Sequence, residues 1–409
     1  MFGQSFDEAM VLYDAGDFKA ARVALEPVAA AGDIQAQLQL GLIYANGTGT
    51  VRQIYKAAGY FKAAADQGDL AGRTYYAAML LSGEGAVQDE SVGYDMMLAA
   101  AEEGWPEAQF SIAEMYWNAR VLKLNKTQII GLRATAVEWL KKAAASGHSD
   151  AMVMLGHAYA SGLKNVPQNV PEALRLYQEA AAMGNAKAAY ALALVHEAGQ
   201  SVPRDANKAM AYYRQAAEGG YPEAQIHLGR IYEKGIGVPA DFVQSTSWYK
   251  KAAEQGDPDA MILLGNAYEF GRGIEQNYRQ AKGWYLRASR AGRPDGEAHF
   301  ALLYYYGKGV KQDVRQANTH LMLAAGQGSA LAGSMLERIR EEKAKSDAAR
   351  KASMEQFLQM LFDAGVALAN SSPTPAPWQT ESDFDREQRH IKEQMERTWG
   401  TVGGMLLLQ

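Results

Sequence analysis

The stretch from Ala224 to Gly256, AQIHLGRIYEKGIGVPADFVQSTSWYKKAAEQG, contains the pattern that decides the fold. Its first half has apolar residues at helical spacing and ends at the glycine pair Gly235 and Gly237. Its second half runs through an Ala-rich segment that ends at Gly256. Because apolar residues three and four positions apart share one face of a helix, each half is predicted to be a short amphipathic helix.

The closing glycine of this stretch recurs along the chain at a nearly constant interval. The recurring glycines are Gly32, Gly68, Gly104, Gly147, Gly184, Gly220, Gly256, Gly292 and Gly328. Successive members are 36 residues apart, except for one interval of 43 and one of 37. A fixed period of this length is typical of tandem repeats, so the sequence predicts an array of about nine units.

Helix-capping residues recur with the same period. Asp or Asn follows either a recurring glycine or the Gly-rich loop, at Asp33, Asp69, Asp89, Asn169, Asn185, Asp205, Asp241, Asp257, Asn277 and Asp313. Pro stands two residues after a recurring glycine at Pro106, Pro222, Pro258 and Pro294. Such side chains accept hydrogen bonds from the first N–H groups of a helix, and Pro suits its first position. Each unit is therefore predicted to be a helix, a Gly-rich loop and a second helix.

The same residue types recur on one face of the first helix in successive units of this sequence. Counting Ala224 as position 1, Leu228, Gly229 and Tyr232 occupy positions 5, 6 and 9, which we expect to form the core. Tyr or Trp-Tyr pairs in the second helix are expected to fill the remaining space. A helix of about 13 residues is marginal alone in water, so each unit must bury its apolar stripe against its neighbours.

From Ala224 to Gly256 the pattern Ala, Leu-Gly, Tyr, Gly-x-Gly, Trp-Tyr, Ala-Ala and Gly resembles the Sel-one-like repeats, a branch of the tetratricopeptide-type α-solenoids. The resemblance spans about residues 5 to 330. It implies an all-α fold, a right-handed superhelix whose first helices line the concave side. The weakest unit is 108–147, where seven extra residues form either a partner-specific protrusion or a tolerated lengthening.

The sequence divides into four regions. Residues 5–330 are the predicted solenoid, and residues 331–370, which read as two longer helices, are predicted to cap it. Residues 371–382 form a Pro- and Ser-rich linker by composition. In 383–409, Phe384, Ile391, Met395 and Trp399 fall on one side of a predicted amphipathic helix, which either folds back onto the solenoid or engages another molecule.

Bulk properties exclude several classes of function. A net charge of -5 and a pI of about 5.9 provide no basic face for nucleic acid, and no apolar run approaches the length of a membrane helix. The absence of Cys removes thiolate chemistry and disulfides. The N-terminus lacks a secretory pattern, so the chain as numbered is expected to be cytoplasmic, or periplasmic if a signal peptide has been removed.

No enzyme, cofactor or metal site is expected. Each Gly-x-Gly loop follows a helix, whereas nucleotide-binding glycine loops follow a strand. His157, His196 and His227 fall in consecutive units, yet none stands three or four residues from another His, as a helical metal site requires. His196 occupies the Tyr position of the predicted core.

Positions 3, 7, 10 and 11 of the first helices are expected to face the groove. The predicted partner-binding residues are Phe110, Trp117, Asn118, His157, Tyr190, Glu197, Arg230, Glu233, Glu269, Phe270, Tyr305 and Tyr306. Aromatic residues and Arg dominate binding hot spots, so Trp117, Tyr190, Arg230, Phe270, Tyr305 and Tyr306 are the preferred anchors. In the alternative, several of these side chains pack between repeats or under the C-terminal tail.

The predicted function is a non-enzymatic scaffold or adaptor that binds a protein or peptide segment in the concave groove. Two alternatives stay open. An inhibitor or immunity-type protein, a role that the resemblance also implies, would plug a single toxin or enzyme. A glycan-binding envelope protein would use the exposed aromatic residues as platforms for sugar rings.

Overall fold

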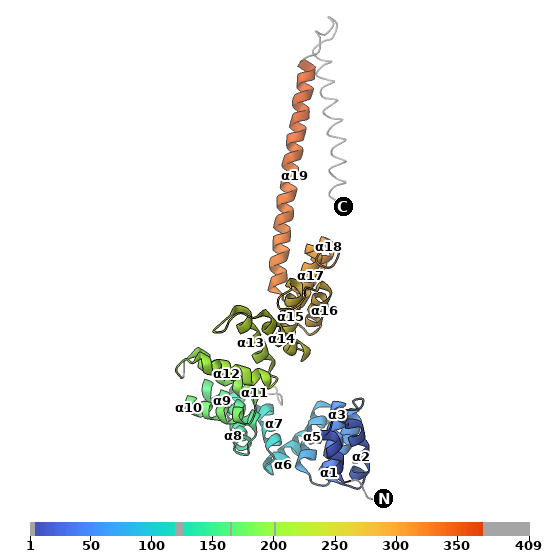
Figure 1. The fold of residues 1–409 in the computed structure, drawn as a ribbon, viewed down its shortest axis with the longest axis vertical. Coiled ribbons are helices and arrows are strands. Elements are labelled where there is room, and N and C mark those ends of the chain that lie inside the picture. The colour runs from blue at the N-terminus through green and yellow to red at the C-terminus, as the bar shows by residue number, and fades with distance from the viewer. Residues whose placement is uncertain (1–4, 119–125, 164–165, 200–201, 371–409) are drawn as a thin grey trace. The chain divides into compact units, whose positions relative to one another are not determined.

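The computed structural model describes residues 5–118, 126–163, 166–199 and 202–370. These residues contain nineteen helices and no strand, apart from one isolated bridge between Leu163 and Val166 (Figure 1). The all-α fold predicted from the sequence is confirmed. Two compact units divide the chain, residues 1–327 and 328–409, and each is considered by itself below.

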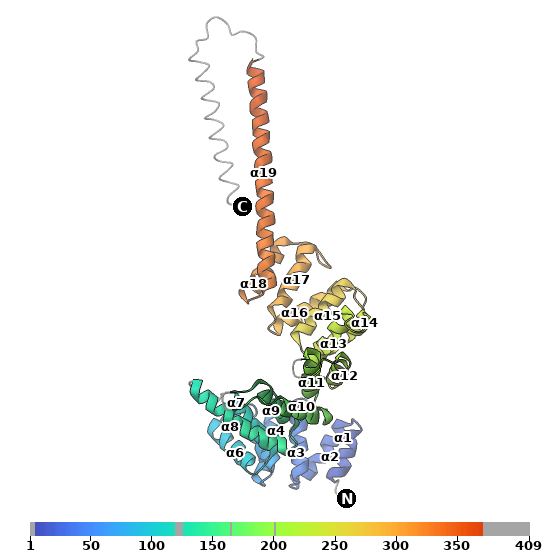
Figure 2. The ribbon, with the colours of Figure 1, turned by 90° about the vertical axis from the view of Figure 1, so that its left-hand side faces the viewer.

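Nine helix pairs make up the first unit. The pairs are α1 Phe6–Asp14 and α2 Phe18–Ala30; α3 Ile34–Asn46 and α4 Ile54–Asp66; α5 Leu70–Ser82 and α6 Glu90–Glu102; α7 Pro106–Trp117 and α8 Lys126–Ala145; α9 Ser149–Ser161 and α10 Val170–Ala182; α11 Ala186–Ala198 and α12 Ala206–Glu218; α13 Pro222–Lys234 and α14 Phe242–Glu254; α15 Pro258–Phe270 and α16 Tyr278–Arg290; α17 Pro294–Tyr306 and α18 Val314–Gly326. Each helix packs mainly against the helices directly before and after it in the chain (Figure 2). The first unit is therefore a solenoid, stabilised by contacts between neighbours.

The predicted caps begin and end these helices. All ten predicted Asp and Asn residues are N-caps whose side chains accept a backbone N–H, as Asp257 does from Ala260 at 2.7 Å. Pro106, Pro222, Pro258 and Pro294 are the first residues of α7, α13, α15 and α17. The first helix of a pair commonly ends at a left-handed glycine such as Gly235, with φ of 69°. Local sequence alone therefore fixes where these helices start and stop.

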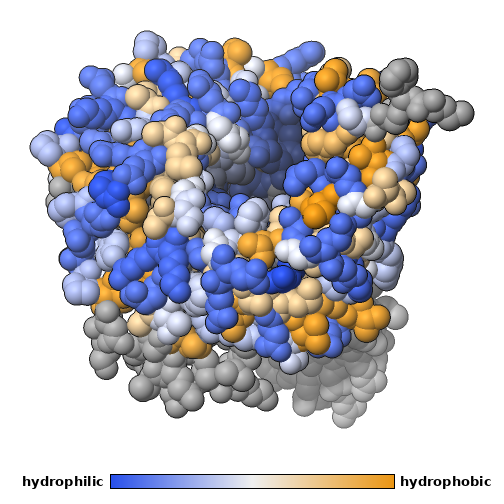
Figure 3. All heavy atoms as spheres, turned by 90° about the horizontal axis from the view of Figure 1, so that it is seen from below, coloured by the Kyte–Doolittle hydropathy of each residue, from blue (hydrophilic) through white to orange (hydrophobic). Residues whose placement is uncertain are grey.

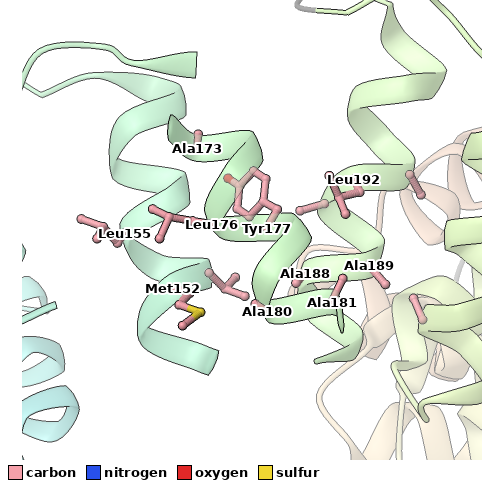
Figure 4. Packing of buried hydrophobic residues seen from close by; sticks show 14 of the residues in the cluster. Met152, Leu155, Ala173, Leu176, Tyr177, Ala180, Ala181, Ala188, Ala189 and Leu192 are labelled. Atoms are coloured by element: carbon pink, nitrogen blue, oxygen red, sulfur yellow. The ribbon is translucent and has the colours of Figure 1, made fainter. Parts of the chain in front are cut away.

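The core lies between successive helices and consists of several clusters of small and large apolar side chains. Figure 4 shows one part of it, where Leu176 of α10 lies toward α9 and Tyr177 of α10 lies toward Leu192 of α11, among alanines. Positions 1, 5 and 6 of the first helices are buried as predicted, except Tyr76 at position 5 of α5, which is half-buried. Position 9 is not uniformly buried, since Tyr44 is buried but its counterpart Tyr232 is only half-buried.

The large buried ring of most units comes from the second helix instead. Tyr177, Tyr213, Tyr249 and Tyr285 are buried. The rings of Tyr177, Tyr249 and Tyr285 lie against the glycine at position 6 of the first helix. A Cβ added to Gly229 would lie 2.3 Å from Cε1 of Tyr249, and one added to Gly265 would lie 2.5 Å from Cε1 of Tyr285. Glycine at position 6 therefore makes room for an aromatic ring.

The irregular unit contains a longer second helix. α8 has 20 residues, whereas the second helices of the other eight pairs have 13. The difference of seven matches the seven extra residues of the sequence. The insertion thus extends a helix of the stack, which favours the lengthening over a separate protrusion. Residues 119–125, between α7 and α8, lie outside the described part of the chain.

The second unit differs from the prediction. One helix, α19 Ala330–Asn370, spans 41 residues where two helices were predicted. The stretch contains no Pro, and its two glycines, Gly333 and Gly365, do not end the helix. No residue in this stretch forces a turn, so the helix continues. The predicted linker 371–382 and the predicted amphipathic segment 383–409 lie outside the described residues.

Candidate partner-binding surface

Three of the predicted partner-binding residues line one cleft of about 320 Å³. Phe110 comes from α7, His157 from α9 and Tyr190 from α11, so successive first helices contribute to it. Met154 and Leu194 add apolar surface, and Leu194 is 41% exposed. The residues of positions 3 and 7 therefore do meet on one surface in this part of the array.

The aromatic wall of this cleft is held by ring contacts. The Tyr190 ring centroid lies 5.2 Å from that of Tyr221 and 5.8 Å from that of Tyr213. Phe110 stacks on His148 at 4.5 Å. Burial raises the pKa of Tyr190, so this side chain stays neutral at physiological pH. Rings fixed in this way present apolar area at a small cost in conformational entropy.

Charged groups border the same cleft. Lys187 Nζ lies 3.3 Å from Oδ1 of Asp150, which also accepts a hydrogen bond of 3.1 Å from Nδ2 of Asn185. Burial alone would raise the pKa of Asp150, but the Asn185 hydrogen bond and the Lys187 charge outweigh it, and the pKa is lowered. The cleft thus combines an apolar floor with a charged border.

Polar contacts fix His157 beside this border. Its Nδ1 lies 2.9 Å from the hydroxyl of Tyr177, and desolvation by the surrounding protein lowers the pKa of the imidazole. Burial raises the pKa of Tyr177 to about 12. Both groups are therefore neutral near pH 7, and the pair supplies hydrogen-bonding capacity without charge.

Three predicted residues have partners within the chain. Glu197, Glu233 and Glu269 all occupy position 10, and each accepts a hydrogen bond from the buried Tyr of the following helix, which is Tyr213, Tyr249 or Tyr285. Each Glu also meets a basic side chain of the next pair. Glu233 and Glu269 meet the cations Arg272 and Lys308, and Glu197 meets the imidazole of His227, whose pKa burial lowers. Because these carboxylates join neighbouring units, we name the series the Tyr–Glu–cation ladder.

Burial of the ladder increases toward the C-terminal end of the first unit. The Glu side chains are 44% exposed at Glu197, 27% at Glu233 and 7% at Glu269. Lys308 Nζ lies 2.8 Å from Oε1 of Glu269, and the Tyr285 hydroxyl lies 2.7 Å from Oε2. Glu269 therefore holds the repeats together and offers little surface to a partner.

A second group of predicted residues forms an exposed aromatic patch. Phe270 and Tyr306 are each about half exposed, and Lys308 Nζ lies 4.8 Å from the Phe270 ring centroid and 5.5 Å from that of Tyr306. The Tyr305 ring meets Tyr306 edge to face at 5.0 Å. The guanidinium of Arg272 lies 5.4 Å from the Phe270 centroid. Cations over these rings keep the patch partly polar.

The three remaining predicted residues are separate from both groups. Trp117 is half-buried against the core, with the Arg133 guanidinium 5.6 Å from its ring centroid. Asn118 is the C-cap of α7 and lines another cleft, of about 580 Å³, with Tyr94. Arg230 is an exposed residue of α13.

Sequence reasoning missed Leu194, Asp150 and Lys187 at the main cleft. Leu194 stands at position 7 of its helix, so the position rule applied to every unit would have found it. Asp150 and Lys187 lie in the first turns of their helices, where the sequence suggests only capping. Asp150 and Lys187 meet at the cleft because two neighbouring units lie close together. The sequence pattern of a single unit does not predict that distance.

Other classes of site find no support in the part of the chain that the structure describes. No three His, Asp or Glu side chains there come together as a metal site would require. No described helix is both long and apolar enough to cross a bilayer. On the face shown in Figure 3, hydrophobic residues occur in small groups between hydrophilic ones, as on surfaces that meet water.

Stacked helix pairs, most of them built of 13-residue helices, with a cleft across successive first helices, define an α-solenoid repeat protein. The chain belongs to the Sel1 repeat family, whose sequence model matches residues 34–69, 71–105, 106–148, 149–185, 186–221, 222–257, 258–292 and 296–329. These eight matches correspond to α3 to α18, so α1 and α2 form an additional N-terminal pair. The resemblance inferred from the sequence is confirmed.

Known proteins share parts of this array. A Sel1 repeat protein from Oxalobacter formigenes is 27% identical, with 77% of this chain and 89% of that one covered and a TM-score of 0.50. The protective antigen c5321 of uropathogenic Escherichia coli is 26% identical, with 88% and 84% covered and a TM-score of 0.42. DAP3-binding cell death enhancer 1 of Mus musculus is 34% identical over 172 residues, 42% of this chain and 32% of that protein. The match spans about a third of the length of the curated relatives.

Proposed function

We propose that this protein is a non-enzymatic scaffold that binds a segment of a partner protein across its first helices. The observation that carries the proposal is the cleft of about 320 Å³ in which Phe110, His157 and Tyr190 meet. An apolar floor with a charged border suits one apolar or aromatic side chain of a partner flanked by polar groups. The name of the mouse relative, which states that it binds DAP3, is consistent with a protein-binding role.

The cleft is preferred over the other predicted residues for a physical reason. Glu233 and Glu269 already pair within the ladder, and Trp117 packs against the core, so a partner would have to break existing contacts to use them. A partner could contact Leu194 without breaking such contacts, because its side chain is apolar and exposed in the cleft. The patch at Phe270 and Tyr306 is a second candidate contact area, because both rings are exposed.

The test is capture of partners from the native organism by the tagged protein, followed by mass spectrometry. Leu194→Glu places a charge in the cleft and should reduce the captured partner by about tenfold or more, since burying an unpaired charge at an interface costs several kcal/mol. Leu323→Glu, at an exposed site of α18 outside the cleft, is the matched control and should capture the partner normally. Circular dichroism should show equal helicity for both variants.

The outcomes separate the alternatives. Equal capture by the two variants would refute the cleft as the binding site. A single stoichiometric toxin or enzyme, inhibited on binding, would replace the scaffold with an inhibitor or immunity-type role. A change in tryptophan fluorescence on titration with envelope glycans, without any captured protein, would favour the glycan-binding alternative.

A further inference from the structure

An apolar stripe is exposed on the C-terminal half of α19. Met354, Phe357, Leu358 and Leu361 are each between 41% and 52% exposed. At 100° per residue these four fall within an arc of about 100°, the width of a stripe that a helix normally buries. In the described part of the chain nothing covers this stripe.

We propose that the stripe is the docking site for residues 383–399 of the same chain, packed as an antiparallel helix. Phe384, Ile391, Met395 and Trp399 fall within a similar arc when this segment is helical. Each stripe then supplies the apolar partner that the other lacks.

The length of the chain fits this arrangement. A helix over 383–399 would be about 25 Å long, and the distance along α19 from Asn370 back to Met354 is about 24 Å. The 12 residues 371–382 extend to about 37 Å in a Pro-rich chain, more than the roughly 10 Å between packed helices. The segment therefore reaches the stripe and covers its whole length.

One antiparallel register matches the two apolar stripes. If Leu361 faces Ile391, then Phe357 faces Met395.

A second copy of the chain is a poorer occupant of the stripe. One heptad before Met354, Phe357 and Leu358 stand Asp347, Arg350 and Lys351, so the apolar seam of α19 stops there. A seam this short is below the three to four heptads typical of a coiled coil between separate chains. A tethered segment needs less contact area, because its effective concentration is in the millimolar range.

Disulfide trapping in the full chain tests this directly, since the protein contains no Cys. Leu361→Cys with Ile391→Cys should form an intrachain bond on mild oxidation, seen as a faster monomer band on a non-reducing gel. Arg340→Cys with Ile391→Cys is the control and should cross-link about tenfold more slowly, because Arg340 lies about 32 Å away along α19. Equal rates for the two pairs, or interchain dimers as the main product of the first pair, would overturn the proposal.

Limited trypsin digestion provides an independent test without Cys. Leu361→Asp should increase cleavage after Arg389 and Lys392 by about tenfold, because a docked segment is protected and a released one is not. Met360→Asp is the matched control. Met360 is the adjacent residue and is also exposed, but it lies about 110° around the helix from the middle of the stripe. Equal cleavage of the two variants and the unaltered chain would refute docking on this stripe.

Discussion

Position 6 of each first helix is matched to the residue that faces it from the second helix. Gly41, Gly156, Gly229 and Gly265 face the rings of Phe61, Tyr177, Tyr249 and Tyr285. At the equivalent positions, Ala77, Ala113 and Ala301 correspond to the aliphatic Met97, Leu140 and Leu321. Ala193 is the exception, because its counterpart is the ring of Tyr213. In most units, therefore, an Ala methyl group at position 6 and an aromatic ring facing it from the second helix do not occur together.

Gly229→Ala should lower the free energy of unfolding by about 1–3 kcal/mol, because the new Cβ overlaps the buried Tyr249 ring. Gly283→Ala is the control in α16, where a Cβ meets no atom within 4 Å. That change should leave stability unchanged or raise it by up to about 1 kcal/mol through helix propensity. Urea denaturation compares the two. A loss of the same size in both variants would show that propensity, rather than the ring, decides position 6.

Histidine burial predicts a loss of stability in mild acid. Burial lowers the pKa of His299, whose ring stacks on Tyr285, while Glu269 and Asp295 act in the opposite direction. The unfolded chain, with a His pKa of about 6.5, then binds protons more readily than the folded protein. The free energy of unfolding should therefore fall as the pH drops below about 6.5 and be insensitive to this group above it.

His299→Gln should flatten the dependence of the urea midpoint on pH between about 7.5 and 5.5. The change removes one group that must be protonated on unfolding and keeps a polar side chain of similar reach. His157 and His227, whose pKa values are also lowered by burial, should retain the rest of the slope. An unchanged slope in the variant would mean that His299 does not contribute to acid sensitivity.

Between elements, the Tyr–Glu–cation ladder predicts a graded series of losses. Glu269→Ala should cost about 1–3 kcal/mol, since it removes the buried acceptor that Tyr285 and Lys308 share and leaves the Tyr285 hydroxyl only Asn266 Oδ1. Glu233→Ala should cost less than half of this, because Glu233 and Arg272 are more exposed. Thermal or urea unfolding measures both. Equal losses at the two sites would contradict burial as the cause.

The ladder also shows how far the sequence could predict the elements and the site. Caps such as Asp257 and helix ends such as Gly235 depend on residues a few positions apart, so the pattern was sufficient for them. The sequence pattern predicted that Glu233 and Glu269 lie on the exposed side of their helices. It did not predict that the hydroxyls of Tyr249 and Tyr285 would reach them from the second helices. In α19 the prediction of two helices was wrong, because no Pro or helix-ending Gly separates them and one helix continues through the stretch.

For the whole first unit, contacts between neighbours predict that damage stays local. Leu140→Ala, at a fully buried site of α8, should cost about 2–5 kcal/mol. Amide hydrogen exchange should accelerate in α7 to α10 and remain unchanged in α15 to α18, because helices pack mainly on those adjacent in the chain. A uniform increase along the array would instead indicate a single cooperative unit.

The extension of α8 shows which lengths such an array tolerates. Seven residues turn a helix through about 700°, which is within about 20° of two complete revolutions. The first residue of the 20-residue α8 therefore points in almost the same direction around the helix axis as the first residue of a 13-residue helix would. Five extra residues would rotate the first residue of the helix by about 140° around the axis, so the preceding loop would enter from a different side of the stack. Helices in this stack should thus grow by whole revolutions, in steps near four, seven or eleven residues.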